Sequence, residues 1–387
     1  MPESEIAVPG ATLGVVGGGQ LGRMLAEAAS PLGVDVVVLD PTPDCPAVPP
    51  AADQIVGGFD DPEALDELAA RSDALTYEIE LADPEHTRAV ADEHGVPVHP
   101  DPETLRTIQD KLVQKRTFAE AGIPVPEFRR VDDAADLEAA FDDLGRPAML
   151  KARTGGYDGR GNEPVSSVEE AREAFDPLAD AMVEDLVDFE RELSVIGVKG
   201  DGETDAFPVV ENRHEPEILR ETLAPARTSD AVRERAREVA LDVLDELSGR
   251  GVYGIELFET SDGEILVNEV APRPHNSGHY SIEGAVTSQF EQHVRAVLGL
   301  PLGDTSLRGP TAMVNVLAEV DSTRPADLSG VDDALDVPGV AFHWYGKEDA
   351  RPLRKMGHLT AVGTDGGATL DSVLSRARKA REAIDFQ

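Results

Sequence analysis

The sequence predicts a chain of several domains, in which an α/β unit with a parallel sheet precedes α+β segments with antiparallel strands. Three observations predict this class. The first hundred residues alternate short apolar strands with amphipathic helices, which is typical of open α/β sheets. Residues 251–274 contain two apolar strands around a tight turn. The length of 387 residues exceeds the usual size of one core, so two or three domains are expected.

The N-terminal unit follows this alternation. An apolar strand at 11–18 ends in glycines, an amphipathic helix follows at 20–33, and a second buried strand occupies 34–40. Strand and helix alternate again after a proline-rich loop, and a further short strand is expected at 96–100. One long helix is then expected over 104–122. The other expected elements are a helix at 133–145, a strand at 147–153, a strand, turn and strand at 184–202, a helix at 228–249 and a last helix near 368–384.

The composition disfavours several classes of function. A formal net charge of -40 disfavours nucleic-acid binding, which requires a basic surface. No apolar run approaches the roughly 20 residues that cross a bilayer, and no signal peptide is expected. Cys45 is the only cysteine, which excludes an intrachain disulfide and fits a reducing cytoplasm. The acidity is spread along the chain and lysine is scarce, which predicts a surface adapted to a salty cytoplasm; an ordinary acidic protein is the alternative.

A glycine motif follows the first strand. Gly17, Gly19 and Gly22 form G-x-G-x-x-G between a strand and a helix, and Asp40 ends the next strand. The same pattern binds the pyrophosphate of NAD, so a nicotinamide-dependent oxidoreductase is one alternative. Because a proline-rich stretch follows Asp40, a phosphate-facing or structural turn is the preferred interpretation.

A second glycine-rich segment predicts phosphate binding. Lys151 ends a strand shortly before residues 155–161, of which four are glycines. Backbone amides of such a loop can contact phosphate oxygens, and a lysine adds a point charge. Lys111 is a candidate for a second phosphate lysine, with a solvated helix residue as the alternative.

Two glutamates within apolar strands predict a metal site. Glu256 and Glu269 lie on the two strands of the expected hairpin, where facing carboxylates would repel unless a cation lay between them. Mg2+ fits, since it binds carboxylate oxygens and nucleotide phosphates, and Asn268 adds another oxygen. The alternative is that one of the glutamates points to solvent.

Other polar groups suggest contacts with a nucleotide or an anion. Residues 184–187 end a strand whose backbone could bind adenine, and Glu192 could bind ribose. Two basic groups predict anion sites, with a salt-bridged surface turn as the alternative for the second. They are Arg273, His275, Asn276 and His279, and then Lys347, Arg351, Arg354, Lys355 and His358.

Together these motifs resemble the ATP-grasp superfamily and, more narrowly, the N5-carboxyaminoimidazole ribonucleotide synthetases. The similar stretches run in the family's order across nearly the full chain, and GGYDGRG with APRPHNSGH is the most specific pair. They are GVVGGGQLGRML, TYEIE, QDKLVQK, LKARTGGYDGRGN, ERELSVI, ENRHEPEIL, GVYGIELF, NEVAPRPHNSGHYSIEG and KEDARPLRKMGH.

The resemblance implies an ATP-grasp fold with an N-terminal Rossmann-like (pre-ATP-grasp) domain and a small β-rich C-terminal domain. The implied domains are 1–103, then 104–300 with a glycine-rich flap subdomain at about 115–183, then 301–387. The resemblance also implies ATP and Mg2+ as cofactors and a cytoplasmic homodimer.

The resemblance assigns roles to individual residues, although Asn162 stands where glutamine is common and Lys111 where arginine is often found. Magnesium is implied at Glu256 and Glu269. ATP contacts are implied at Lys111, Lys151, Gly156, Tyr157, Asp158, Gly159, Arg160, Gly161, Asn162, Glu184, Asp185, Leu186, Val187, Glu192, His214, Asn268 and Glu269. Contacts with aminoimidazole ribonucleotide are implied at Glu78, Tyr157, Asp158, Arg160, Arg273, His275, Asn276, Lys347 and Arg354.

The implied reaction is carboxylation of aminoimidazole ribonucleotide with ATP and bicarbonate, through carboxyphosphate, in purine synthesis. Lys151 would neutralise the transferred phosphoryl group, Arg273 would hold carboxyphosphate, and Asp158 or His275 would accept the amine proton. Another ATP-grasp purine ligase, such as a formate-dependent glycinamide ribonucleotide transformylase, is the nearest alternative. A non-catalytic nucleotide-binding regulator is disfavoured by the two strand glutamates.

Overall fold

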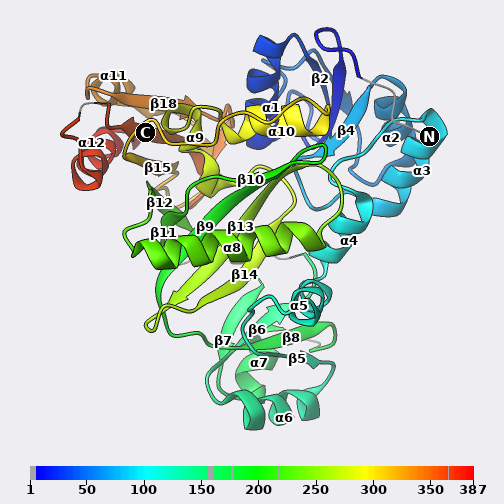
Figure 1. Ribbon diagram of the computed structural model, residues 1–387, viewed down its shortest axis with the longest axis vertical. Coiled ribbons are helices and arrows are strands. Elements are labelled where there is room, and N and C mark those ends of the chain that lie inside the picture. Colours follow the sequence, from blue (N-terminus) through cyan, green and yellow to red (C-terminus); the bar gives the residue numbers. More distant parts are fainter. Residues whose placement is uncertain (1–5, 156–160, 176–177, 216–217, 365) are drawn as a thin grey trace.

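The computed structural model describes residues 6–155, 161–175, 178–215, 218–364 and 366–387. Figure 1 shows the N-terminal unit and the C-terminal residues at the top, the large sheet in the centre, and a small sheet with helix α6 at the bottom. The expected class, a parallel α/β unit followed by antiparallel α+β parts, is confirmed.

The N-terminal unit is a parallel sheet with the strand order β3-β2-β1-β4. The strand expected at 96–100 is wrong: within it only Val98 forms a bridge, to Leu75, because Pro97 and Pro100 have no N–H to donate. The elements are β1 Thr12–Val16, α1 Gln20–Ala29, η1 Ser30–Leu32, β2 Asp35–Asp40, β3 Asp53–Val56, α2 Pro62–Ala70, β4 Ala74–Tyr77 and α3 Pro84–His94.

The single helix expected over 104–122 is also wrong, because the chain forms two helices there. α4 (Pro102–Gln109) and α5 (Lys111–Glu120) meet at Asp110, whose backbone is extended (φ -107°, ψ 104°). The Asp110 carboxylate accepts hydrogen bonds from the N–H groups of Leu112 and Val113, which starts a new helix. The break places Lys111 in the first turn of α5.

The flap subdomain is a small antiparallel sheet with the strand order β5-β8-β6-β7. Ala148, Leu150 and Val183 point to one face, where they pack with residues of the two covering helices. By strand alternation, Lys151 and Glu184 point to the opposite face. The elements are β5 Phe128–Val131, α6 Ala134–Leu144, β6 Ala148–Ala152, β7 Asn162–Val165, α7 Val168–Ala174 and β8 Ala181–Asp185.

The central sheet contains nine strands among the described residues, with α8 packed on one face. Strands β15, β20 and β18 from the C-terminal part extend this sheet beyond β12 instead of forming a sheet of their own. Its main elements are β9 Phe189–Lys199, β10 Thr204–Ala206, β11 Val210–His214, β12 Leu219–Ala224, α8 Asp230–Glu246, β13 Gly251–Thr260, β14 Ile265–Ala271, β15 Thr311–Leu317, β18 Val340–Trp344 and β20 Lys355–Val362.

Shorter elements complete the chain around this sheet. The last helix, α12 (Leu370–Ala383), packs against β15 and β20, near the position expected for it. Within the described ranges, no helix has the length and apolar character that a membrane span requires. The other elements are η2 Asn276–Gly278, α9 Ser281–Gly284, α10 Gln289–Val297, β16 Arg324–Pro325, β17 Leu328–Ser329, α11 Val331–Leu335, β19 Asp349–Ala350 and β21 Asp385–Phe386.

Candidate active site

The two glutamates expected at a metal site lie side by side on the central sheet. Glu256 of β13 and Glu269 of β14 are direct cross-strand partners. A β-bulge follows this pair, because Leu257 pairs with Val267 and leaves Asn268 as an extra residue. Bulges redirect side chains next to active sites, and here the Asn268 amide oxygen accepts a hydrogen bond from Lys151 Nζ at 3.3 Å.

Three lysines contact carboxylates of this region: Lys111 contacts Glu269, and two further lysines contact Glu184. Lys111 Nζ lies 3.1 Å from Glu269 Oε2. Lys115 Nζ and Lys151 Nζ lie 3.2 Å and 2.8 Å from the two carboxylate oxygens of Glu184. Because these lysines come from α5 and β6, the site brings together the flap subdomain and the central sheet (Figure 1).

Lysine is concentrated at this site. The whole chain has only seven lysines, at 111, 115, 151, 199, 347, 355 and 379. The first three lie between the two sheets, and Lys347 donates a hydrogen bond to the backbone oxygen of Lys355 near the expected substrate side. An acidic chain that keeps its few ammonium groups together has a strong local field for anions.

Charge and burial shift the pKa values of the carboxylates in opposite directions. Burial, reinforced by the charge of Glu269, raises the pKa of Glu256. The charge of Lys111 lowers the pKa of Glu269 despite burial. Burial would raise the pKa of Glu184, but Lys115 and Lys151 hold it below its usual range. Thus Glu256, which forms no ion pair with a lysine among the described residues, is the carboxyl that most favours an added cation.

Two residues predicted to contact the nucleotide, Glu192 and His214, lie next to each other. His214 Nδ1 on β11 lies 2.8 Å from Glu192 Oε2 on the adjacent strand β9. Burial alone would lower the pKa of His214, but the hydrogen bond to Glu192 and nearby negative charge raise it. Past Glu184, Asp185 and Leu186 are exposed at the end of β8, and their contact with adenine stays a prediction.

The N-terminal glycine turn is already filled by a side chain of the protein. The carboxylate of Glu78 accepts hydrogen bonds from the N–H groups of Gly19 and Gly22, and Asp40 accepts one from Gly18. A Cβ added at Gly17 would lie 2.2 Å from Glu78 Cγ. Burial raises the pKa of Glu78 to about 7. These contacts disfavour a dinucleotide phosphate in the turn and support the structural interpretation.

The basic loop after β14 joins this turn to the metal strands. Arg273 Nη2 lies 2.8 Å from Glu80 Oε1, in the loop that follows Glu78. His275 Nε2 lies 3.5 Å from Glu256 Oε1, and burial together with Arg273 lowers the pKa of His275 to about 3. Arg273 and His275, both predicted site residues, therefore lie with Glu256 between the N-terminal unit and the central sheet.

Two expected contributors on the substrate side make mostly internal contacts. Asn276 is buried, and its amide exchanges hydrogen bonds with the amide of Asn315 at 2.7 and 3.2 Å. His358 was grouped with the basic residues of a predicted anion site, but it is fully buried, and its Nδ1 lies 2.9 Å from the Tyr345 hydroxyl. That part of the second basic group is wrong, because His358 lies on a central strand, β20.

One cation of the second basic group, Lys347, reaches the N-terminal unit. Lys347 Nζ donates to the side-chain oxygen of Gln20, at the start of α1, at 2.7 Å. Arg354 donates to the backbone oxygen of Asp349 at 2.8 Å. Lys347 therefore links the C-terminal part to the turn that holds Glu78, although 327 residues separate it from Gln20.

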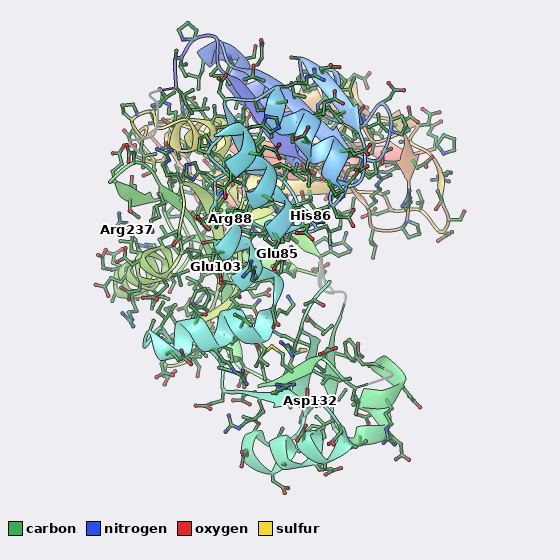
Figure 2. All side chains as sticks on the ribbon, turned by 90° about the vertical axis from the view of Figure 1, so that its right-hand side faces the viewer. Glu85, His86, Arg88, Glu103, Asp132 and Arg237 are labelled. Carbon is green, nitrogen blue, oxygen red and sulfur yellow. The ribbon has the colours of Figure 1, made fainter. Side chains whose placement is uncertain are left out.

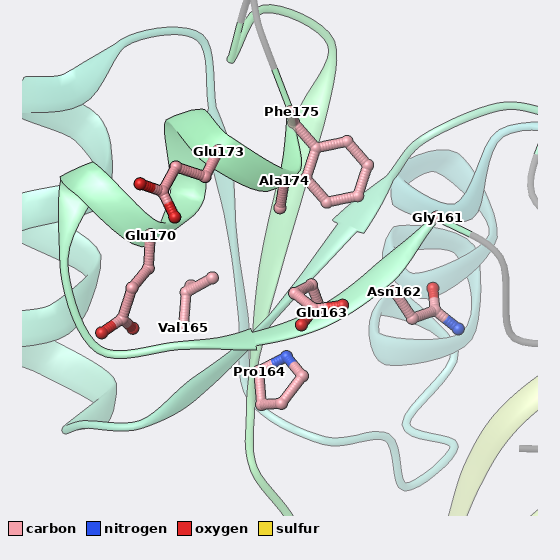
Figure 3. Close-up of a pocket in the computed structure, with 9 residues that line it drawn as sticks. All are labelled: Gly161, Asn162, Glu163, Pro164, Val165, Glu170, Glu173, Ala174 and Phe175. Atoms are coloured by element: carbon pink, nitrogen blue, oxygen red, sulfur yellow. The ribbon is translucent and has the colours of Figure 1, made fainter. Parts of the chain in front are cut away.

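A separate hollow of about 600 Å³ lies away from the lysines and glutamates described above, and Figure 3 shows it between β7 and α7. Its lining includes the expected residues Gly161 and Asn162, but also the carboxylates of Glu163, Glu170 and Glu173. Three carboxylates without a lysine disfavour a triphosphate there. The expected residues Gly156, Tyr157, Asp158, Gly159 and Arg160 lie outside the described residues, so their roles stay predictions.

Comparison with known proteins agrees with this geometry. Residues 10–109 match the ribonucleotide synthetase preATP-grasp domain, residues 116–290 the ATP-grasp domain, and residues 311–372 the phosphoribosylaminoimidazole carboxylase C-terminal domain. The N5-carboxyaminoimidazole ribonucleotide synthase of Brucella melitensis is 42% identical over 359 residues, which cover 92% of this chain and 97% of that protein.

The chain belongs to the N5-carboxyaminoimidazole ribonucleotide synthase family.

Further relatives place this family membership in context. The chloroplastic phosphoribosylaminoimidazole carboxylase of Vigna aconitifolia is 43% identical over 362 residues, and the chain spans only 64% of its length. A crystal structure of the Aspergillus clavatus N5-carboxyaminoimidazole synthase, in complex with ADP and 5-aminoimidazole ribonucleotide, superposes with a TM-score of 0.89. It is 36% identical, and the match covers 97% of this chain and 98% of that one. The family-wide ATP-grasp fold expected from sequence is therefore confirmed.

Sequence reasoning missed one residue of this synthase site. Lys115 lies within the stretch QDKLVQK that supports the family resemblance, but no role was predicted for it. The signal was present: Lys115 follows Lys111 by four residues, so the two share one helix face in a chain that has few lysines.

Proposed function

We propose that this protein carboxylates 5-aminoimidazole ribonucleotide with ATP and bicarbonate, giving N5-carboxyaminoimidazole ribonucleotide, ADP and phosphate. One observation carries the proposal: the cross-strand pair Glu256 and Glu269 lies beside two lysines, because Lys111 contacts Glu269 and Lys151 contacts the adjacent Asn268. A family relative was solved with ADP and 5-aminoimidazole ribonucleotide together, which supports the same two ligands here.

The nucleotide would lie between the flap and the central sheet. Lys111 and Lys151 supply positive charge for its phosphates, and the end of β8 offers its backbone to the adenine. Glu192, oriented by His214, is placed to accept hydrogen bonds from ribose hydroxyls. The loop 156–162 is proposed to cover the phosphates, as its glycines predict.

The family also implies Mg2+, and the donor set fits this ion. Glu256, Glu269 and Asn268 present hard oxygen atoms, and the raised pKa of Glu256 indicates a carboxyl that gains from a nearby cation. The described residues contain no group of three or more acidic, histidine or cysteine side chains arranged for a metal, so the phosphates would supply further ligands. When bound, the ion would neutralise charge on the phosphates.

The proposed reaction has two steps. An oxygen of bicarbonate attacks the γ-phosphorus of ATP, the bond to the leaving ADP oxygen breaks, and carboxyphosphate forms; Lys151 stabilises the added charge. The amine nitrogen of the ribonucleotide then bonds to the carboxyl carbon, and phosphate leaves with its electron pair. Arg273 is proposed to hold carboxyphosphate, and Asp158 or His275 to accept the amine proton.

The ribonucleotide is proposed to lie toward the N-terminal unit. Glu78, Arg273, His275 and Asn276 border this side, and Lys347 with Arg354 would bind its phosphate from the C-terminal part. Tyr157, Asp158 and Arg160 are proposed to close over it from the loop.

The test of the reaction is phosphate release by the purified protein. With MgATP and bicarbonate at molar KCl concentration, adding 5-aminoimidazole ribonucleotide should raise phosphate release at least about tenfold. Formate with glycinamide ribonucleotide serves as the matched substrate pair and should give no stimulation. Stimulation by that pair instead, or by neither, would contradict the proposed substrate.

We also propose that the protein is a cytoplasmic homodimer adapted to high salt, with domains at 1–103, 104–300 and 301–387. Figure 2 shows charged side chains covering one side of the molecule, where Arg88 and Glu85 of α3 lie near Glu103 of α4. Arginines on this side are shared among several acids: Arg106 lies 3.6 Å from Glu85 and 3.2 Å from Glu103. Light scattering would give the oligomeric state, and unfolding in a KCl series should show stability rising with salt.

A further inference from the structure

The buried carboxylate of Glu184 contacts two ammonium groups at once. Lys151 Nζ lies 2.8 Å from Glu184 Oε2, and Lys115 Nζ lies 3.2 Å from Glu184 Oε1. The side chains of Lys115 and Glu184 are each 2% exposed, and that of Lys151 is 8% exposed. All three charges are therefore shielded from water, where a charged group that loses its partner is strongly destabilised.

Lys115 is fixed in this position from the other side. Its Nζ donates a hydrogen bond of 2.8 Å to the backbone oxygen of Val267, on the strand that bears Asn268 and Glu269. Its contact with Glu184 is an ion pair and adds no further hydrogen bond. Lys115 thus joins α5 to β14 and to β8 of the flap subdomain, and its charge stays beside Glu184.

Lys151 has a different set of partners. Its second contact is the Asn268 amide oxygen at 3.3 Å, a longer and neutral interaction. If Lys151 turned from Glu184 toward a phosphate, Lys115 would still neutralise the Glu184 carboxylate. Without Lys115, Lys151 would be the only ammonium of the described residues in ion-pair contact with Glu184, and turning away would leave the buried carboxylate without an ion pair.

We propose that Lys115 is a positioning residue that acts through Glu184 and leaves Lys151 available to bind the triphosphate. This inference rests on the proposed function, in which Lys151 binds nucleotide phosphates. Lys115 itself is not proposed to contact the nucleotide. Lys151 and Glu184 alone would form a neutral ion pair. With Lys115 they form a group of two cations and one anion, which has a net positive charge.

The experiment compares two nucleotides that differ in their phosphates. Binding of AMPPNP, a non-hydrolysable ATP analogue, and of AMP is measured by calorimetry in Mg2+ for wild type and Lys115→Met. We expect Lys115→Met to weaken AMPPNP at least about tenfold and AMP less than about threefold, because only the triphosphate needs Lys151. Equal weakening of both ligands would show a general distortion of the cleft and overturn the proposal.

Three further variants separate positioning from packing. Lys199→Met is the matched control, because Lys199 Nζ also donates to backbone oxygens, those of Leu244 and Leu247 at 2.8 and 2.6 Å, but forms no ion pair with a carboxylate among the described residues. It should leave the ratio of AMPPNP to AMP affinity unchanged. Lys115→Arg keeps the charge and should retain the ratio if it folds. Adding Glu184→Gln to Lys115→Met should recover AMPPNP affinity to within about threefold of the Glu184→Gln single variant, since no buried anion then holds Lys151.

The outcomes also distinguish this proposal from the proposed reaction. The binding measurements need neither bicarbonate nor the ribonucleotide. A protein with the expected nucleotide selectivity but no ribonucleotide-stimulated phosphate release would contradict the reaction and support the role of Lys115. Absence of recovery in the double variant, with a normal melting transition, would overturn the role of Lys115 while phosphate release stood.

Discussion

The glycine turn near the N-terminus and the lysine cleft between the two sheets both look like anion sites, yet the structure completes only the first. In the turn, the N–H groups of Gly19 and Gly22 bind the Glu78 carboxylate, so the anion is part of the chain. In the cleft, Lys115 and Lys151 share the single carboxylate of Glu184, so this group of three side chains carries a net positive charge.

This difference teaches that a motif shows what can bind, whereas the surrounding side chains decide whether binding is still possible. Donors that already have a buried internal acceptor gain little from a ligand, because the ligand must replace a contact of the same kind. Cations in excess of their partners gain a full charge-assisted contact. The cleft is therefore the better nucleotide site, although the turn has the more familiar sequence motif.

The largest expected effect comes from removing a carboxylate of the cleft. Glu269→Gln should lower kcat for ribonucleotide-stimulated phosphate release by at least about 100-fold, because it removes the charge that pairs with Lys111 and is proposed to bind Mg2+. Glu264→Gln, an exposed position near the start of the same strand, should keep wild-type activity. Steady-state rates and circular dichroism check this, and wild-type activity in Glu269→Gln would refute the metal role.

An intermediate effect is expected where the C-terminal part meets the glycine turn. Lys347→Ala should raise KM for 5-aminoimidazole ribonucleotide by about 10- to 100-fold, because one charged contact with its phosphate is lost. KM for ATP should change little. Lys379→Ala, on the exposed side of α12, is the control. A rise in KM for ATP alone would place Lys347 at the wrong substrate.

A smaller effect on stability should distinguish the filled turn. The pKa of Glu78, about 7, lies above the ordinary value of 4.5, so the folded state binds this proton more tightly. The stabilisation is fully present below pH 4.5 and is lost as pH rises through 7. The stability of wild type relative to Glu78→Gln should therefore fall across that range in urea titrations. A pH-independent difference would contradict a buried Glu78 carboxyl.

The smallest effect is expected for NADH. Fluorescence titration should show no binding of NADH to wild type, because the turn amides are occupied by Glu78. A saturable change in NADH fluorescence that excess NAD abolishes would show that the turn still binds a dinucleotide. It would restore the oxidoreductase alternative.

Much of this protein could be predicted from local patterns. The predicted hairpin placed Glu256 and Glu269 on facing strands, which the strand register confirms. The lysine before a glycine loop indicated a phosphate site, and that site stays a prediction. The break at Asp110 was missed because the apolar pattern of residues 104–122 continues across it, and only the capping carboxylate interrupts the helix. No role was predicted for Lys115, which the fold buries.

The sequence by itself determined the class of fold, the order of its elements and which side chains carry charge, since these depend on periodicity and residue type within short windows. The tertiary structure alone decided which charges meet. Glu78 lies 59 residues from Gly19, and Lys115 lies 152 residues from Val267, so neither contact has a local signature. Whether a cation is satisfied or left in excess is a property of that folded neighbourhood, because burial makes each missing or added partner costly.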